Sequence, residues 1–535
     1  MGTSNYGGRN GGPGPAANLF SSSKEDIEAD DFLHDPNYKR REDGCVFWSP
    51  RGFLNVISVI ILVCGLLALF AGYPIISYLT RRHGDKMGGF NLGGTNGTGQ
   101  VPVISQLLGL QDRDTPSSAR TWTSATGTKY NLVFSDEFNE EGRTFWPGDD
   151  PFWEAQDLWY GATGDLEWYT PEAVNTTNGA LQITMTDIPA HNLNFQSGMV
   201  QSWNKFCFQG GYIEFNAVLP GSMQETGYWP GLWLQGNLAR AGHLGTTDGM
   251  WPYSYNSCDS GILPNQTAPG RPGYDAVSTS ADKYSNNIGL NWLSGMRTPA
   301  CTCAGEDHPG PNVNVGRSAP ELDILEAQVH SNVGETSQSL QIAPFDLEYK
   351  WDEDLATITD TTQTRFNPYT GGHYQEALSS LTKIQDKSYA KSGNEFTRFG
   401  VEFTPDFTGG GKGQVTWYMD GQTTWKVTEA SVPPVQAIDI GQRLVPQEPM
   451  SIIMNLGISK GFQTIDFSSL VFPATMRIDY VRVYQPSSYS SPKTSCDPPD
   501  FPTKDYIDRH MDVYTNPNLT TWPHGLARNR LTDNC

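Results

Sequence analysis

The stretch QVTWYMDGQTTWKV, Gln414–Val427, is typical of a β-hairpin. Apolar or β-branched residues occupy alternate positions on both sides of Asp420-Gly421, which is the pattern of two half-buried strands. An Asp-Gly pair between such runs favours a two-residue turn, because both turn positions take positive φ. The segment therefore predicts two adjacent antiparallel strands.

Short segments of the same kind recur from Tyr130 onward, and turn residues separate them. No long helical periodicity interrupts them, so we predict an antiparallel β-sandwich or barrel with long inserted loops. The segments are NLVFSDEF (131–138), ALQITMT (180–186), GGYIEFNAVLP (210–220) and MRIDYVRVY (476–484).

Three carboxylates are threaded through aliphatic residues in PELDILEA, residues 320–327. Alternation along a strand puts Glu321 and Asp323 on one face. A one-residue bulge within Ile324–Leu325 would return Glu326 to that face, and bulges are common beside active sites. Carboxylates that close cannot all ionise, so at least one pKa should rise, as a general acid requires. The spacing alone also fits an edge strand with a solvated acidic face.

Two stretches lack the strand alternation, Gly236–Arg317 and Asp346–Asn394. Loops of this length are usually functional or tied down. Both flank elements near the acidic segment, so we expect them to wall a cleft.

The bulk composition narrows the class of ligand. A formal charge of −22 argues against nucleic acid, which favours basic surfaces. The chain also has 15 Trp, 23 Tyr and 24 Phe, and flat aromatic faces suit sugar rings, although core packing accounts for most of them. Cys301-Thr302-Cys303 is not a zinc-ribbon spacing and no other ligand set stands out, so we predict no metal and no cofactor.

The N-terminal region has three parts. Residues 1–51 are polar and cannot bury a core, so we expect a disordered tail. The run Phe53–Tyr73 carries no charge and is long enough to cross a bilayer, which predicts a transmembrane signal anchor within residues 52–79. Residues 80–115 are Gly-rich and polar and read as a stem.

Glycosylation sequons favour a cytosolic N-terminus and a luminal or extracellular body, because all four follow the apolar run. They begin at Asn96, Asn175, Asn265 and Asn518. Six cysteines also follow it and allow up to three disulfides, in any of 15 pairings. We expect the Pro-rich residues 489–535, with two of these cysteines, to be tied to the body by disulfides.

Several runs resemble glycoside hydrolase family 16, in the order seen there. They are LVFSDEFN (132–139), FQSGMVQSWNKFCFQGGYIEFNAVLPG (195–221), YWPGLWL (228–234), ELDILEA (321–327) and MRIDYVRVYQ (476–485). The resemblance indicates a family 16-like domain over residues 116–488, with an insert at 236–317.

Other runs resemble, within that family, the membrane-anchored fungal β-glucan synthesis-associated proteins named for killer-toxin resistance. They are DGMWPYSYNSCDSGILPNQT (248–267), CTCAGEDHPGP (301–311), SQSLQIAPFD (337–346) and CDPPDFPTKDY (496–506).

The resemblance implies an all-β, concanavalin-like curved jelly-roll sandwich with a glucan cleft on its concave face. By the family motif, Glu321 would be the nucleophile, Asp323 would orient it and Glu326 would be the general acid/base. Trp229 and Trp233 would stack on glucosyl rings, although only one reaches the cleft if the two straddle a bend. Weaker cleft candidates are Glu167, Trp168, Tyr169 and His330.

The resemblance also implies three functions to compare. The first is a retaining glycosidase or transglycosylase of cell-wall β-1,6-glucan assembly, in the endoplasmic reticulum, the Golgi or at the plasma membrane. The second is a β-1,3-glucan endo-hydrolase, and the third a non-catalytic glucan-binding scaffold of the synthesis machinery. The partners implied are β-glucan, the membrane as a type II single-pass protein, and other glucan-synthesis components. The insert of about 80 residues, absent from compact family members, would narrow the cleft and disfavours ordinary endo-hydrolysis.

Overall fold

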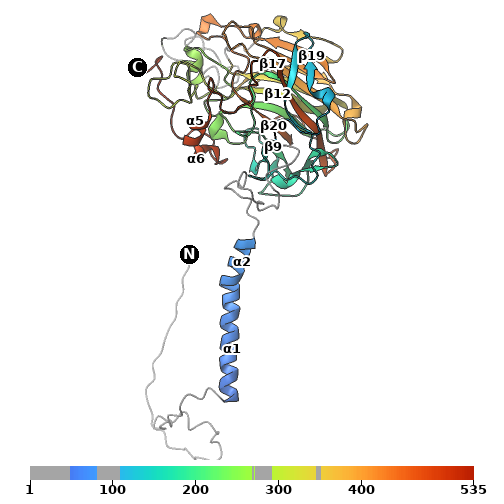
Figure 1. The fold of residues 1–535 in the computed structure, drawn as a ribbon, viewed down its shortest axis with the longest axis vertical. Coiled ribbons are helices and arrows are strands. Elements are labelled where there is room, and N and C mark those ends of the chain that lie inside the picture. Colours follow the sequence, from blue (N-terminus) through green and yellow to red (C-terminus); the bar gives the residue numbers. More distant parts are fainter. Residues whose placement is uncertain (1–48, 81–108, 268–269, 271–291, 345–350) are drawn as a thin grey trace, which may run out of the picture. The chain divides into compact units, whose positions relative to one another are not determined.

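The computed structural model describes residues 49–80, 109–267, 270, 292–344 and 351–535 (Figure 1). The chain divides into two compact units, residues 1–81 and 82–535, which are described separately.

The described part of the first unit is one continuous helical rod. It consists of α1 (Pro50–Leu67), a π-helical segment (Ala68–Gly72) and α2 (Tyr73–Thr80). Within it, Gly52–Ile76 is 25 residues long, has a mean hydropathy of 2.8 and buries none of its most apolar stretch against protein. This helix has the length and composition of a membrane span, as the sequence predicts for residues 52–79.

The second unit contains two large sheets. In the first, the strand order is β1-β2-β21-β10-β17-β18-β19-β14, with β7 paired to β21 and β6 to β7. The strands are β1 (Thr121–Thr123), β2 (Lys129–Asp136), β6 (Val174–Thr177), β7 (Ala180–Met185), β10 (Gly211–Val218), β14 (Thr357–Ile358), β17 (Thr397–Thr404), β18 (Gln414–Met419), β19 (Gln422–Thr428) and β21 (Ala474–Pro486).

The second large sheet has the order β15-β16-β13-β12-β11-β20-β9-β3 and carries the acidic segment. Its strands are β3 (Glu154–Ala155), β9 (Met199–Gln201), β11 (Trp229–Gly236), β12 (Glu321–His330), β13 (Val333–Ile342), β15 (Thr364–Phe366), β16 (Glu376–Lys383) and β20 (Met450–Gly457). A small sheet adds β4 (Leu158–Trp159), β5 (Glu167–Tyr169) and β8 (Phe195–Ser197).

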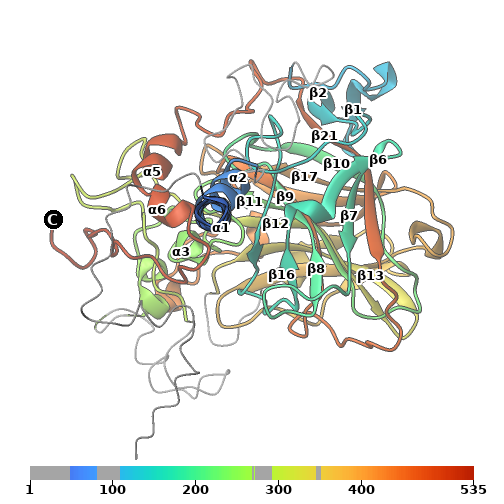
Figure 2. The ribbon, with the colours of Figure 1, turned by 90° about the horizontal axis from the view of Figure 1, so that it is seen from below.

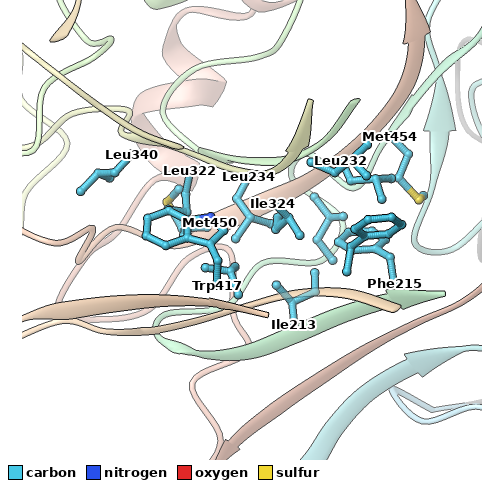
Figure 3. Close-up of a cluster of buried hydrophobic side chains, with 14 of the residues drawn as sticks. Ile213, Phe215, Leu232, Leu234, Leu322, Ile324, Leu340, Trp417, Met450 and Met454 are labelled. Carbon is cyan, nitrogen blue, oxygen red and sulfur yellow. The ribbon is translucent and has the colours of Figure 1, made fainter. Parts of the chain in front are cut away.

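The main hydrophobic core lies between the two large sheets (Figure 3). Leu234 and Ile324 enter it from the second sheet, and Ile213 and Phe215 enter from the first. Every pairing within the two large sheets is antiparallel, so the predicted all-β sandwich is confirmed. The opposite face of β11–β13 lies away from this core and lines a cavity.

The predicted hairpin is confirmed. Strands β18 and β19 are adjacent and antiparallel, and the two turn residues Asp420 and Gly421 have φ values of 49° and 77°. Positive φ at both positions is what a two-residue hairpin turn of this kind requires.

The expectation that Asp346–Asn394 is loop-like is wrong. Among its described residues are β14, β15 and the eight-residue β16, which pairs with β13 from Glu335↔Lys383 to Ile342↔Glu376. The sequence of β16, EALSSLTK, hides its alternation because two residues on the face toward the other sheet, Ser380 and Thr382, are polar although fully buried, while Ser379 on the opposite face lines a cavity.

The described residues form three disulfides, the most that the cysteine count allowed. Cys207–Cys496 ties the C-terminal extension to the body, Cys258–Cys301 lies within the insert, and Cys303–Cys535 joins the insert to the extension. The insert contributes α3 (Leu244–Thr247), and the extension contributes α5 (Lys504–Arg509) and α6 (Met511–Tyr514). These three helices lie together on one side of the sheets (Figure 2).

Candidate active site

A bulge in β12 gathers the acidic side chains, as predicted. On the β11 side, Leu232 pairs with Leu325 and Trp233 with Asp323, so Ile324 is the extra residue. The ladder with β13 shifts at the same place. Beyond the bulge the alternation is reset, and Glu326 returns to the face that carries Asp323.

The three carboxylates of β12 line one cavity of about 790 Å³. That volume lies in the range of roughly 300–1,000 Å³ typical of ligand sites. Its floor comes from β11, β12, β13, β16 and β20, and its walls come from loops. The floor residues are Trp229, Gly231, Trp233, Gln235, Glu321, Asp323, Glu326, Gln328, Ser337, Ser339, Gln341, Ala377, Ser379 and Asn455.

Neighbouring strands hold Asp323 and Glu326 in place. Gln341 Nε2 donates to Asp323 Oδ2 at 2.9 Å. Ser339 Oγ lies 3.0 Å from the same oxygen and 3.4 Å from Glu326 Oε2. From the opposite sheet, Trp417 Nε1 donates to the backbone carbonyl of Asp323 at 2.7 Å. Asp323 is therefore fixed by both sheets at once.

The insert supplies a partner for Glu321 that the sequence analysis missed. Trp251 Nε1 donates to Glu321 Oε2 at 2.8 Å. Trp251 lies in the run DGMWPYSY, which on the sequence is one aromatic among many in a loop. The sequence carries no signal that would single it out, because the contact spans 70 positions.

All three carboxyls have pKa values above their ordinary range. Burial raises the pKa of Glu321 well above its usual value, and Asp323 and Glu326 raise it further, while the Trp251 hydrogen bond opposes the rise. Burial raises the pKa of Asp323 to about 6. Burial and then Asp323 raise that of Glu326 well above its usual value, against hydrogen bonds from Trp229 and Ser339. At neutral pH the cluster can therefore retain a proton, as acid catalysis requires.

Both predicted cleft tryptophans line the cavity. Trp229 and Trp233 lie on the same face of β11, and the pairing of β11 with β20 runs without a shift from Trp229 to Gly236. They do not straddle a bend, so the case in which only one reaches the cleft does not arise. The Trp229 ring stacks on Phe462 with centroids 4.2 Å apart, and Trp233 Nε1 donates to Asn455 Oδ1 at 2.8 Å.

The weaker candidates separate into two groups. Tyr169 lines the cavity, and Glu167 lies buried behind it. Trp168 faces away, as alternation along β5 requires, and stacks on His191 with centroids 3.8 Å apart. His330 is exposed at the end of β12 and does not line the cavity.

A hydrogen-bonded chain runs from the floor to a second acidic pair, which the sequence analysis did not select as a whole. Asn455 Nδ2 donates to the Tyr169 hydroxyl at 3.1 Å, and that hydroxyl donates to Asp165 Oδ2 at 3.1 Å. Burial raises the pKa of Asp165 to about 6, and burial together with Asp165 raises that of Glu167 well above its usual value. Tyr160, also in the cavity, has its pKa raised by burial and by Glu321.

The predicted sequons differ in exposure. Asn175 and Asn518 are exposed and Asn265 is half-buried, while Asn96 lies outside the described residues. Among the residues that the structure describes, no group of three or more His, Cys, Asp or Glu is arranged to hold a metal ion.

Known proteins are similar to this chain over most of its length. The sequence model of a family described as "Beta-glucan synthesis-associated protein SKN1/KRE6/Sbg1" matches residues 20–535. SKN1 of Candida albicans is 41% identical over 523 residues, which is 96% of this chain and 67% of the relative. KRE6 of Saccharomyces cerevisiae is 39% identical over 546 residues, which is 98% of this chain and 71% of the relative. Among solved structures, an endo-β-1,3-glucanase from Pyrococcus furiosus aligns over 69% of this chain and 99% of its own, with 18% identity and a TM-score of 0.39.

Proposed function

Because the chain belongs to the SKN1/KRE6/Sbg1 family of β-glucan synthesis-associated proteins, we propose that its cavity binds β-glucan and transfers glycosyl units with retention of configuration. The observation that carries this proposal is the bulge at Ile324, which brings Glu321, Asp323 and Glu326 into one cavity walled by aromatic rings.

In the proposed reaction the two glutamates divide the work. Glu321, as a carboxylate, attacks the anomeric carbon while Glu326 donates its proton to the departing glycosidic oxygen, which leaves a glycosyl ester on Glu321. Glu326 then takes a proton from an incoming hydroxyl, and that oxygen displaces Glu321 from the anomeric carbon. Gln341 and Ser339 hold the Asp323 carboxyl in place by hydrogen bonds. From that fixed position Asp323 influences the pKa of Glu321.

The nature of the incoming hydroxyl distinguishes the two candidate enzymatic functions. A sugar hydroxyl gives transglycosylation, and water gives hydrolysis. We favour transfer, because the insert places Trp251, Trp292 and other residues around the cavity and so adds surface that can hold an acceptor. We further propose that transfer to this acceptor contributes to β-1,6-glucan assembly. We also propose that the protein is a type II membrane protein of the secretory pathway, with its body on the luminal or outer side.

A non-catalytic glucan-binding scaffold is the alternative from another class. A binding site has no need for three carboxyls whose pKa values burial raises, since their protonation costs stability at neutral pH. The intact trio therefore favours turnover over binding alone.

The test uses the full-length protein with Glu321→Gln and Glu326→Gln. We expect both variants to lose at least about a thousandfold in transfer activity on gluco-oligosaccharides, since each removes one of the two reacting carboxyls. Glu335→Gln is the matched control, because Glu335 is a buried carboxylate on β13 that does not line the cavity. Wild-type activity in both test variants would overturn the proposal. Products longer than the substrate indicate transfer, and products that are only shorter indicate hydrolysis.

A further inference from the structure

Residues of the insert meet the loop between β15 and β16 beside the cavity. The Trp292 backbone N–H donates to the His373 carbonyl at 3.0 Å. The two rings also stack, with centroids 3.7 Å apart, and the Tyr374 ring lies edge-on to Trp292 at 5.7 Å. We call this contact the Trp292–His373 bridge. It joins two segments that are 81 positions apart in the sequence.

Both sides of the bridge are anchored. On the insert side, the segment that follows Trp292 is held by Ser294 Oγ, which donates to Asp248 Oδ1, and by the Met296 N–H, which donates to the Ile262 carbonyl at 2.9 Å. On the other side, the Ala377 N–H donates to the Thr370 carbonyl at 2.9 Å and closes the loop at the start of β16.

The loop between β15 and β16 spans the width of the cavity at the β16 edge. At one end its His373 contacts the insert, which enters the sheet beside Glu321. At the other end its Tyr369 lies close enough to Glu326 for that carboxyl to raise the pKa of the phenol, after burial. Tyr369, Tyr374 and Gln375 all line the cavity. A glucan chain that crosses β11, β12 and β13 in the cavity would therefore meet this loop before it reached the edge of the sheet.

The floor next to the loop has two buried polar atoms that the described residues leave without partners. Gln341 Oε1 on β13 and Ser379 Oγ on β16 make no hydrogen bond to any residue that the structure describes, although the two residues are only 8% and 2% exposed. Both residues line the cavity, and β13 and β16 are adjacent strands. A buried oxygen without a partner is costly, and a ligand with several hydroxyl groups would satisfy both.

We propose that the Trp292–His373 bridge closes the cleft at the β16 edge, so that the site takes the end of a glucan chain and not an internal segment. The terminal sugar lies over Gln341 and Ser379, and the chain leaves past Trp229 and Phe462 on the other side of the carboxylates. The inference rests on the proposed function and adds the substrate class, which is a chain terminus or a short oligosaccharide.

The experiment compares full-length protein on linear gluco-oligosaccharides of one length, β-1,3- and β-1,6-linked, either free or carrying a bulky cap at one end or at the other. In the wild type we expect one of the two caps to lower turnover at least about tenfold, because that end has to enter the closed pocket. Trp292→Ala and His373→Ala should each restore turnover of the blocked substrate. Trp168→Ala is the matched control, since Trp168 also stacks on a histidine but lies outside the cavity.

The outcomes are distinguishable. Turnover of free and of both capped substrates at equal rates would overturn the closed end and leave the proposed function standing. If Trp292→Ala and His373→Ala both discriminated against the capped substrate as strongly as wild type, with thermal unfolding unchanged, the Trp292–His373 bridge would not be what closes the cleft. Neither turnover nor binding of any free oligosaccharide would overturn the proposed function and this inference together.

Discussion

The floor and the insert wall of the cavity are built by different forces. The floor residues sit on β11, β12, β13 and β16, and backbone ladders fix their positions. The wall is held by side chains that reach backbone carbonyls, by ring contacts and by disulfides. The insert wall consists of Leu244, Thr247, Asp248, Gly249, Trp251, Tyr253, Trp292, Leu293 and Ser294.

Arg297 illustrates how the wall is held. It is 1% exposed, and its guanidinium donates to the carbonyls of Thr246 and Asp248 at 3.0 and 2.9 Å. It also lies over the Trp522 ring of the C-terminal extension, 3.6 Å from the centroid. Arg297 thus joins the insert to the extension, as do Arg240, which donates to the Tyr514 carbonyl, and the disulfide Cys303–Cys535. The backbone ladders hold the floor strands in place without help from the buried carboxyls, so the floor can keep these carboxyls although their charge is unfavourable there. The wall depends instead on side-chain contacts and disulfides.

The largest expected effect is on the floor. Burial raises the pKa of folded Asp323 from its ordinary value of 3.8 to about 6. As pH rises, the unfolded chain therefore releases the Asp323 proton before the folded protein does. The free energy of unfolding falls for this reason between pH 4 and pH 6. Asp323→Asn removes that dependence, and we expect the variant to gain about 1–3 kcal/mol over wild type above pH 6 and little below pH 4. Thermal unfolding at pH 4 and pH 7.5 measures it.

Asp479→Asn is the control for this measurement, because Asp479 is a half-buried carboxyl with a raised pKa outside the cavity. If Asp323→Asn were less stable than wild type at pH 7.5, the negative charge of Asp323 would not be unfavourable in the folded protein, and the prediction would be wrong.

A smaller effect is expected on the wall. Arg297→Met leaves buried carbonyls without a donor and removes the contact with Trp522, which should cost about 1–2 kcal/mol. We expect faster amide exchange in residues 244–262 and 505–522, with protection of β11 and β12 unchanged. Arg528→Met, at an exposed ion pair, is the control. Equal loss of protection in the floor strands would show that floor and wall are not separate.

The smallest effect is expected where wall and floor touch. Trp251→Phe keeps the ring but removes the N–H that donates to Glu321, a bond that lowers the pKa of that carboxyl. Without the bond the pKa of Glu321 rises further, so the acid limb of the pH–rate profile should move to higher pH. Turnover at neutral pH should fall by about tenfold. Trp203→Phe removes an indole donor outside the cavity and should leave the profile in place. An unmoved acid limb in Trp251→Phe would separate the insert from the chemistry.

Part of the floor and the hairpin of the other sheet could be predicted from the sequence. Alternation placed Glu321 and Asp323 on one face and turn chemistry indicated the hairpin, whereas Glu326 joins that face only through the bulge, which alternation by itself does not require. Strand β16 escaped prediction because its face toward the other sheet carries the buried polar residues Ser380 and Thr382 beside Leu378, so apolar residues do not alternate along it. Trp168 and His330 are close in sequence to cleft residues, but strand alternation and the end of β12 carry them away from the cavity.

The sequence by itself determined the all-β class, the apolar N-terminal helix, an upper limit of three disulfides and the close spacing of the three acids on β12. These depend on periodicities and counts within short windows. Only the tertiary structure decided which cysteines pair, that Trp251 reaches Glu321, that Trp417 secures Asp323 from the opposite sheet, and that Trp292 meets His373. Those contacts join residues far apart in the chain, and their partners are chosen by how the sheets and loops pack, which no local pattern records.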